Sequence, residues 1–138
     1  MGKNYIRIIV HCVWTTKYRL PLLTIEHITL LQEIVDEFAQ NNHCTLLALN
    51  AVHDHVHMLL QLTATIPLEE CIHTIKGKSS RIFNQQFPQT HFGWQRGYGA
   101  FSVDYRNIPS VKRYIDQQQH HHCDNILKHL DPTEHGEQ

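Results

Sequence analysis

The chain has 138 residues, of which 41% are hydrophobic, 18% are charged and 13 are histidines. This length and composition exclude a disordered chain and predict one folded domain over residues 1–138, with 131–138 as a frayed polar tail. No apolar run approaches the roughly 20 residues that span a bilayer. Because the N-terminus also lacks a secretory signal, we expect no membrane contact and a cytoplasmic location.

The formal net charge of −1 conceals two basic segments. Residues 1–19 contain four lysines and arginines and no acid, and residues 76–113 contain seven against Asp104 alone. If both segments reach one face of the fold, that face would attract a nucleic acid. An ordinary solvated surface explains the charge pattern equally well.

Two further patterns exclude common site classes. The four cysteines form no CxxC pair, which favours free, buried thiols over a zinc ribbon or a disulfide framework. The sequence Gly77-Lys78-Ser79 follows Ile72, where a phosphate-binding loop requires glycine, so no ATP site is expected.

The first half of the chain predicts a strand, a helix and two more strands. Asn4–Trp14 is rich in Ile and Val, as buried strands are. Apolar residues at three- and four-residue spacing predict a helix over 24–42, with Thr24 as its N-cap. Cys44–Ala51 and His55–Leu62 read as strands joined by a short polar turn.

The second half predicts a helix, one or two strands and a last helix. Pro67 can begin a helix that continues to about Phe87, and Phe92–Val103 suits one or two strands with a bulge. Pro109 opens a helix expected to run to about Leu130. The order predicts an α+β fold, a ferredoxin-like antiparallel sheet with helices on one face and an added C-terminal helix.

His55 and His57 form the first candidate site. Alternate side chains of a strand share a face, so both imidazoles would point the same way and could reach one metal ion, while Val56 and Met58 enter the core. Taken alone, two surface histidines are the commoner explanation of this pattern.

Tyr114 and Gln118 form the second candidate site. On a helix their spacing of four residues stacks a phenol above an amide oxygen that could complete a metal site. His120, His121 and His122 would splay around such a helix and could not all bind one ion. Ordinary packing explains Tyr114 when it is considered alone.

Together these motifs resemble the single-tyrosine HUH transposases of bacterial and archaeal insertion sequences, the IS200-like family. The resemblance rests on DHVHML at 54–59, KGKSS at 76–80, WQRGYGAFSV at 94–103 and YIDQQQHHH at 114–122. The four motifs occur in the family's order and cover nearly the whole chain.

The resemblance implies a DNA transposase. Its C-terminal helix carries the nucleophile Tyr114, which cleaves and rejoins single-stranded DNA through a 5′-phosphotyrosine. His55, His57 and Gln118 would hold a divalent ion, Mg²⁺ or Mn²⁺. The partners would be single-stranded DNA with hairpin ends and a second copy of the chain, with each site shared between subunits. The expected DNA-binding residues are Lys17, Arg19, Lys76, Lys78, Arg81 and Arg96.

Two other functions remain open from the sequence. The first is a catalytically silent hairpin-binding protein of the same fold. The second is a small metal-dependent phosphodiesterase in which water replaces Tyr114 as the nucleophile.

Overall fold

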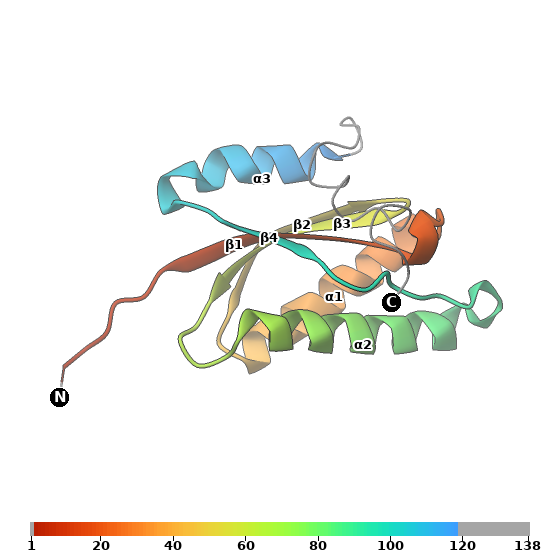
Figure 1. The fold of residues 1–138 in the computed structure, drawn as a ribbon, viewed down its shortest axis with the longest axis horizontal. Helices are drawn as coiled ribbons and strands as arrows, with labels where there is room; N and C mark the ends of the chain where they lie inside the picture. Colours follow the sequence, from red (N-terminus) through yellow and green to blue (C-terminus); the bar gives the residue numbers. More distant parts are fainter. Residues whose placement is uncertain (1, 119–138) are drawn as a thin grey trace.

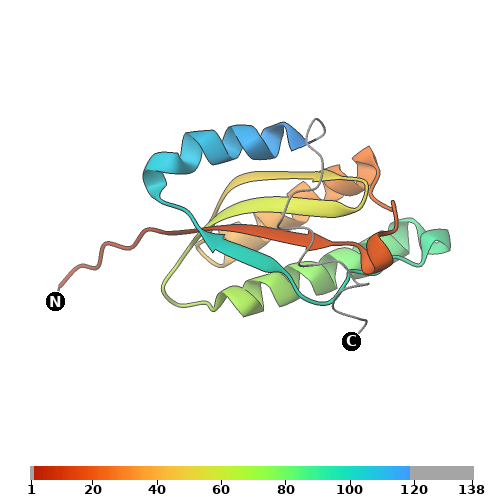
Figure 2. The ribbon, with the colours of Figure 1, turned by 45° about the horizontal axis from the view of Figure 1, so that its top comes forward.

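A computed structural model describes residues 2–118, which form one antiparallel sheet flanked by helices. The strands are β1 (Ile8–Thr15), β2 (Thr45–Val52), β3 (His55–Leu62) and β4 (Gly99–Ser102), in the order β2-β3-β1-β4 (Figure 2). The α-helices are α1 (Ile25–Asn41), α2 (Leu68–Gln86) and α3 (Ile108–Asp116). This confirms the ferredoxin-like α+β fold.

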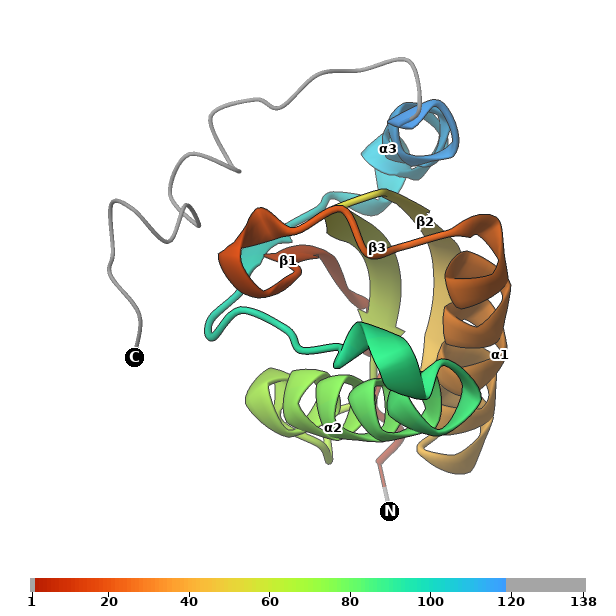
Figure 3. The same ribbon diagram turned by 90° about the vertical axis from the view of Figure 1, so that its right-hand side faces the viewer.

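The helices divide between the two faces of the sheet. Helices α1 and α2 lie side by side on one face, and α3 lies on the other (Figures 1 and 3). The main core therefore fills the space between the sheet and the α1–α2 layer. The opposite face carries a single short helix, which leaves room there for polar side chains.

Alternation along the central strands decides which side chains reach the core. Val56 and Met58 of β3 are fully buried against the α1–α2 layer, as predicted, together with Cys12 and Trp14 of β1. The intervening residues of both strands point to the α3 face. Among residues 2–118, Cys12, Cys44 and Cys71 are free and buried, as predicted for these thiols.

Helix α1 follows the sequence prediction closely. The Thr24 hydroxyl accepts a hydrogen bond from the backbone N–H of His27, and the His27 side chain accepts one from the Thr24 N–H, which satisfies two donors at the helix start. Leu31 and Val35 are fully buried and dock the helix on the sheet.

Helix α3 is shorter than the sequence predicted. It ends at Asp116, where Asn50 of β2 donates its Nδ2 to the carbonyls of Ile115 (3.0 Å) and Asp116 (3.2 Å). These bonds satisfy carbonyls that a further helical turn would have used. The expected continuation to Leu130, the histidines at 120–122, Cys123 and the tail at 131–138 lie outside the described residues.

The segment between Phe92 and Val103 contains one strand, within the one or two that the sequence predicted. Only Gly99–Ser102 pairs with β1, and Trp94 makes one isolated bridge to Thr16. Side chains of α2 bind this backbone instead: Asn84 bonds both the N–H and the carbonyl of Phe92. Because these groups are satisfied, the loop needs no partner strand.

Strand β1 also begins later than predicted. Ile8 pairs with Leu62, the last residue of β3, and in the described part of the chain residues 2–7 belong to no strand. In residues 2–118 no helix combines the length and apolarity needed to cross a bilayer.

Candidate active site

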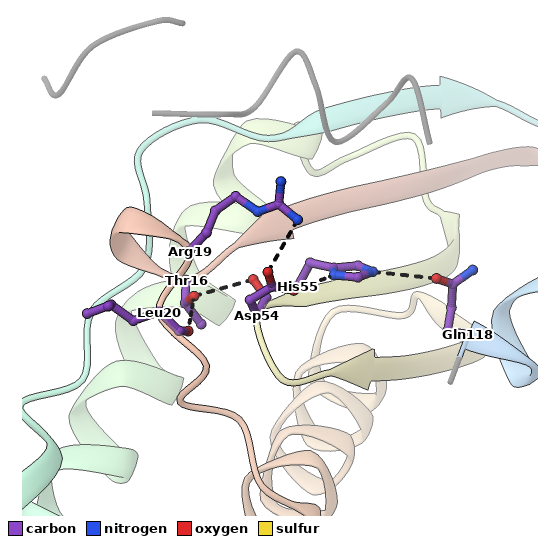
Figure 4. Close-up of polar contacts among 6 residues, drawn as sticks. All are labelled: Thr16, Arg19, Leu20, Asp54, His55 and Gln118. Carbon is purple, nitrogen blue, oxygen red and sulfur yellow. Dashed lines mark hydrogen bonds and ion pairs between the residues drawn. The ribbon is translucent and has the colours of Figure 1, made fainter. Parts of the chain in front are cut away.

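His55 and His57 lie on the α3 face of β3, as the strand alternation predicted. Their ring centroids are 5.2 Å apart, and both residues are buried. The Nδ1 atom of His55 lies 2.8 Å from Oδ1 of Asp54 (Figure 4). Because the carboxylate accepts a proton from Nδ1, the lone pair of the neutral imidazole is placed on Nε2, where a metal ion could use it.

The sequence did not single out a third histidine that belongs to this site. His11 of β1 lies one strand away, and its Nε2 is 2.9 Å from Nδ1 of His57, with ring centroids 5.1 Å apart. His11 and His57 are 46 residues apart, so no local spacing connects them. The available signal is alternation within β1: His11 shares a face with Ile9, opposite the core residues Val10 and Cys12.

Tyr114 and Gln118 approach the histidines from α3. The Tyr114 ring lies 5.6 Å from that of His57 and 6.2 Å from that of His11. Gln118 lies beyond the helix end, yet its Nε2 donates to the Tyr114 carbonyl at 3.2 Å and its Oε1 is 3.5 Å from His55 Nε2. The four residues that the sequence placed in one site are therefore neighbours within a single chain.

These atoms form a donor set that suits a divalent ion. Within residues 2–118, no three His, Cys, Asp or Glu side chains are arranged to hold a metal ion, so the set consists of two imidazoles and the Gln118 amide oxygen. The 3.5 Å separation of His55 Nε2 and Gln118 Oε1 is somewhat wider than the roughly 3.0 Å between adjacent donors of an octahedral ion with bonds of about 2.1 Å, so both atoms could reach one Mg²⁺ or Mn²⁺ after a small side-chain adjustment.

Asp54 is held as a carboxylate behind His55. Burial alone would raise its pKa, but the hydrogen bond from His55 and electrostatic attraction to His55, Arg19 and His53 outweigh burial, so the pKa falls below its usual value. Arg19 Nη2 lies 3.2 Å from Asp54 Oδ2. The sequence had assigned Arg19 to DNA and had given Asp54 no role.

The two basic segments meet in space. The N–H of Lys17 donates to the carbonyl of Gly93, and the N–H of Tyr18 donates to Oε1 of Gln95, which joins the turn after β1 to the loop that follows α2. A hollow of about 300 Å³ lies between α2 and this loop, and both Lys76 and Arg96 line it. Lys17, Lys76 and Arg96 thus belong to one region.

Two of the expected DNA-binding lysines already have protein partners. The Nζ of Lys76 donates to the carbonyls of Gln95 and Gly97, each at 2.8 Å, and burial lowers the Lys76 pKa to about 8. The Nζ of Lys78 lies 2.9 Å from Glu37 of α1. Arg81 is exposed on α2 and Arg96 on the loop.

Curated relatives of the chain are transposases. It is 27% identical over 124 residues to the ISDra2 transposase TnpA of Deinococcus radiodurans, which covers 85% of this chain and 89% of the relative. It is also 27% identical over 114 residues to the transposase for insertion sequence element IS200 of Salmonella typhimurium, which covers 78% of this chain and 74% of the relative.

Solved structures show the same fold. A candidate transposase from Deinococcus radiodurans superposes with a TM-score of 0.67 at 28% identity, over 86% of this chain and 96% of the other. A REP-associated tyrosine transposase bound to a REP hairpin gives a TM-score of 0.61 at 15% identity, over 99% and 73% of the two chains. The family model described as transposase IS200-like matches residues 4–118, which include every residue of the site, and the chain therefore belongs to this family of transposases.

Proposed function

We propose that this transposase cleaves and rejoins single-stranded DNA with Tyr114 as its nucleophile. The observation that carries the proposal is the meeting of Tyr114, two histidines and a glutamine oxygen on the face of the sheet opposite its main core. A tyrosine beside a candidate metal site is a pairing suited to phosphoryl transfer.

The chemistry consists of two balanced exchanges. Tyr114 loses its phenolic proton as its oxygen attacks a DNA phosphorus. A bond from phosphorus to tyrosine forms, and the bond to the 3′ oxygen breaks as that oxygen takes up a proton. A 3′-hydroxyl then attacks the 5′-phosphotyrosine, the new strand bond forms and the phenol is released. No ATP is required because each step makes one phosphoester as it breaks another.

The protein's own groups would orient this reaction. His55, whose Nδ1 faces Asp54, would offer Nε2 to a divalent ion. His57 would do the same in the tautomer whose Nδ1–H donates to His11, and Gln118 would offer its amide oxygen. A bound Mg²⁺ or Mn²⁺ would polarise the phosphate and neutralise developing charge. A free phenol has a pKa of about 10, so Tyr114 needs such assistance near neutral pH.

The proposal also includes a DNA hairpin as the substrate and a second copy of the chain as a partner. The exposed side chains of Lys17, Arg81 and Arg96 are candidates to contact a hairpin, and the complex of the REP-associated relative with a hairpin supports that substrate class. We include a homodimer whose subunits exchange α3, because this helix is short and the exposed link at Asp104–Asn107 precedes it.

A covalent adduct tests the nucleophile. Labelled single-stranded DNA from the ends of the chain's own element, with its hairpin and flanks, is mixed with protein and Mn²⁺ or Mg²⁺ and run on a denaturing protein gel. We expect a labelled band at the mass of protein plus DNA, absent with Tyr114→Phe and with chelator.

Two other results would redirect the proposal. A shifted band on a native gel without any covalent band would indicate the silent hairpin binder. Cleavage that survives Tyr114→Phe, without an adduct, would indicate a phosphodiesterase that uses water.

A further inference from the structure

Arg19, in the turn after β1, contacts the candidate metal site through the carboxylate of Asp54, the residue before β3. Oδ2 of Asp54 lies 3.2 Å from Nη2 of Arg19, while Oδ1 lies 2.8 Å from Nδ1 of His55, and His55 Nε2 in turn faces Gln118 (Figure 4). The two oxygens of Asp54 are thus divided between an arginine and a candidate metal ligand. Rotation of this carboxylate would disturb both contacts at once.

The backbone of this turn is shaped to present Arg19. Tyr18 and Arg19 have φ values of 57° and 55°, in the left-handed region that non-glycine residues rarely adopt. Thr16 fixes the turn to Asp54, because its N–H donates to the Asp54 carbonyl at 2.9 Å and its hydroxyl donates to the Leu20 carbonyl at 2.6 Å. Such a conformation persists only where surrounding contacts hold it.

Arg19 is less suited to DNA than its neighbour Lys17. The Arg19 side chain is 23% exposed, and its Nε is shielded from solvent. Its Nη2 already contacts Asp54, so fewer of the guanidinium N–H groups can bind a phosphate. Lys17, by contrast, is exposed.

We propose that Arg19 is a positioning residue for the metal site: its guanidinium fixes the Asp54 carboxylate, which fixes the ring orientation and tautomer of His55. This inference rests on the metal site of the proposed function. Two residues of the first basic segment would then have different roles: Lys17 would contact nucleic acid, and Arg19 would support the metal site of the protein itself.

Binding of Mn²⁺ alone, without DNA, tests the proposal. The free ion is followed by its electron paramagnetic resonance signal during titration. Loss of a group behind a ligand weakens metal binding by roughly 10–100-fold, and we expect Asp54→Asn to fall in that range. Arg19→Gln acts one residue further from the ion and should weaken Mn²⁺ binding less, by about threefold to tenfold.

A double-mutant cycle shows whether Arg19 acts through Asp54. In the Asp54→Asn background, Arg19→Gln should cause no further loss of Mn²⁺ affinity, because the carboxylate it holds is gone. Arg19→Lys keeps the positive charge but loses the planar guanidinium, and its affinity for Mn²⁺ should lie between that of Arg19→Gln and that of the wild type. Should Arg19→Gln fail to fold, Arg19→Lys decides alone, and unchanged affinity in that variant overturns the proposal.

Lys17→Gln is the matched control in the same turn. It should keep wild-type Mn²⁺ affinity and lose affinity for a fluorescent hairpin strand measured by anisotropy in chelator. If Arg19→Gln behaves like Lys17→Gln, Arg19 is a phosphate contact and the proposal is wrong. If wild type binds Mn²⁺ no better than His57→Ala, the metal site of the proposed function fails instead.

Discussion

The two histidines of β3 are held by different neighbours. His55 is backed by the negative Asp54, and His57 by the imidazole of His11. Both contacts engage Nδ1. In the tautomers in which Nδ1–H of His55 donates to Asp54 and Nδ1–H of His57 donates to His11, Nε2 of each ring carries the lone pair that a metal ligand needs. The orientation of the two candidate metal ligands therefore depends on Asp54 and His11, which lie outside the His-x-His motif.

At this scale we predict that His11 stabilises the folded chain. His11→Phe removes the partner of His57 Nδ1 in an enclosed position and should lower the free energy of unfolding by about 1–3 kcal/mol. His11→Gln places an amide near the lost Nε2 and should recover most of that loss. Urea unfolding in chelator measures both, and equal stability of the two variants would contradict the prediction.

Helix α3 is the element that brings the tyrosine to the histidines. Its buried side chain is Ile115, which packs on Ile9 and Leu59. Asn50 adds hydrogen bonds at the C-terminal end of the helix. This small contact sets how firmly Tyr114 is positioned, since the rest of the helix is largely exposed.

We predict that Ile115→Ala releases α3 without unfolding the sheet. Loss of a fully buried isoleucine side chain costs about 2–5 kcal/mol, which is large for a nine-residue helix. Hydrogen exchange should accelerate in α3 while β1 and β3 keep their protection. Val111→Ala, at a half-buried position of the same helix, is the control and should have a smaller effect; equal acceleration throughout the sheet would refute the idea.

The elements also show where sequence reasoning succeeds. His55 and His57 could be placed because strand alternation is local, and α1 because its apolar spacing and Thr24 cap agree. The end of α3 could not be placed, because it depends on Asn50, which lies 65 residues earlier in the chain than Ile115. His11 was missed for the same reason, since its partner lies on another strand.

The whole molecule raises the question of which chain supplies the tyrosine. The described residues bring Tyr114 to His57 within one chain, while the proposed dimer exchanges α3 between subunits. The same contacts serve both arrangements, because an exchanged helix meets an identical surface.

A mixing experiment decides between them. An equal mixture of His57→Ala and Tyr114→Phe, after subunit exchange, should recover about one quarter of the wild-type adduct, because half of the dimers are mixed and one site in each is intact. Each variant alone should form none. No recovery, although mass spectrometry shows mixed dimers, would place both residues in the same chain.

The strand order has a consequence for folding of the chain during its synthesis on the ribosome. Strand β1 is synthesised before both of its partners, which are β3, where Ile8 pairs with Leu62, and β4, where Val10 pairs with Ser102. The nascent chain must therefore carry an apolar, unpaired β1 until both partners have emerged. Long-range pairing of this kind slows folding and exposes strand edges, so synthesis rate and chaperones would govern the yield of active transposase.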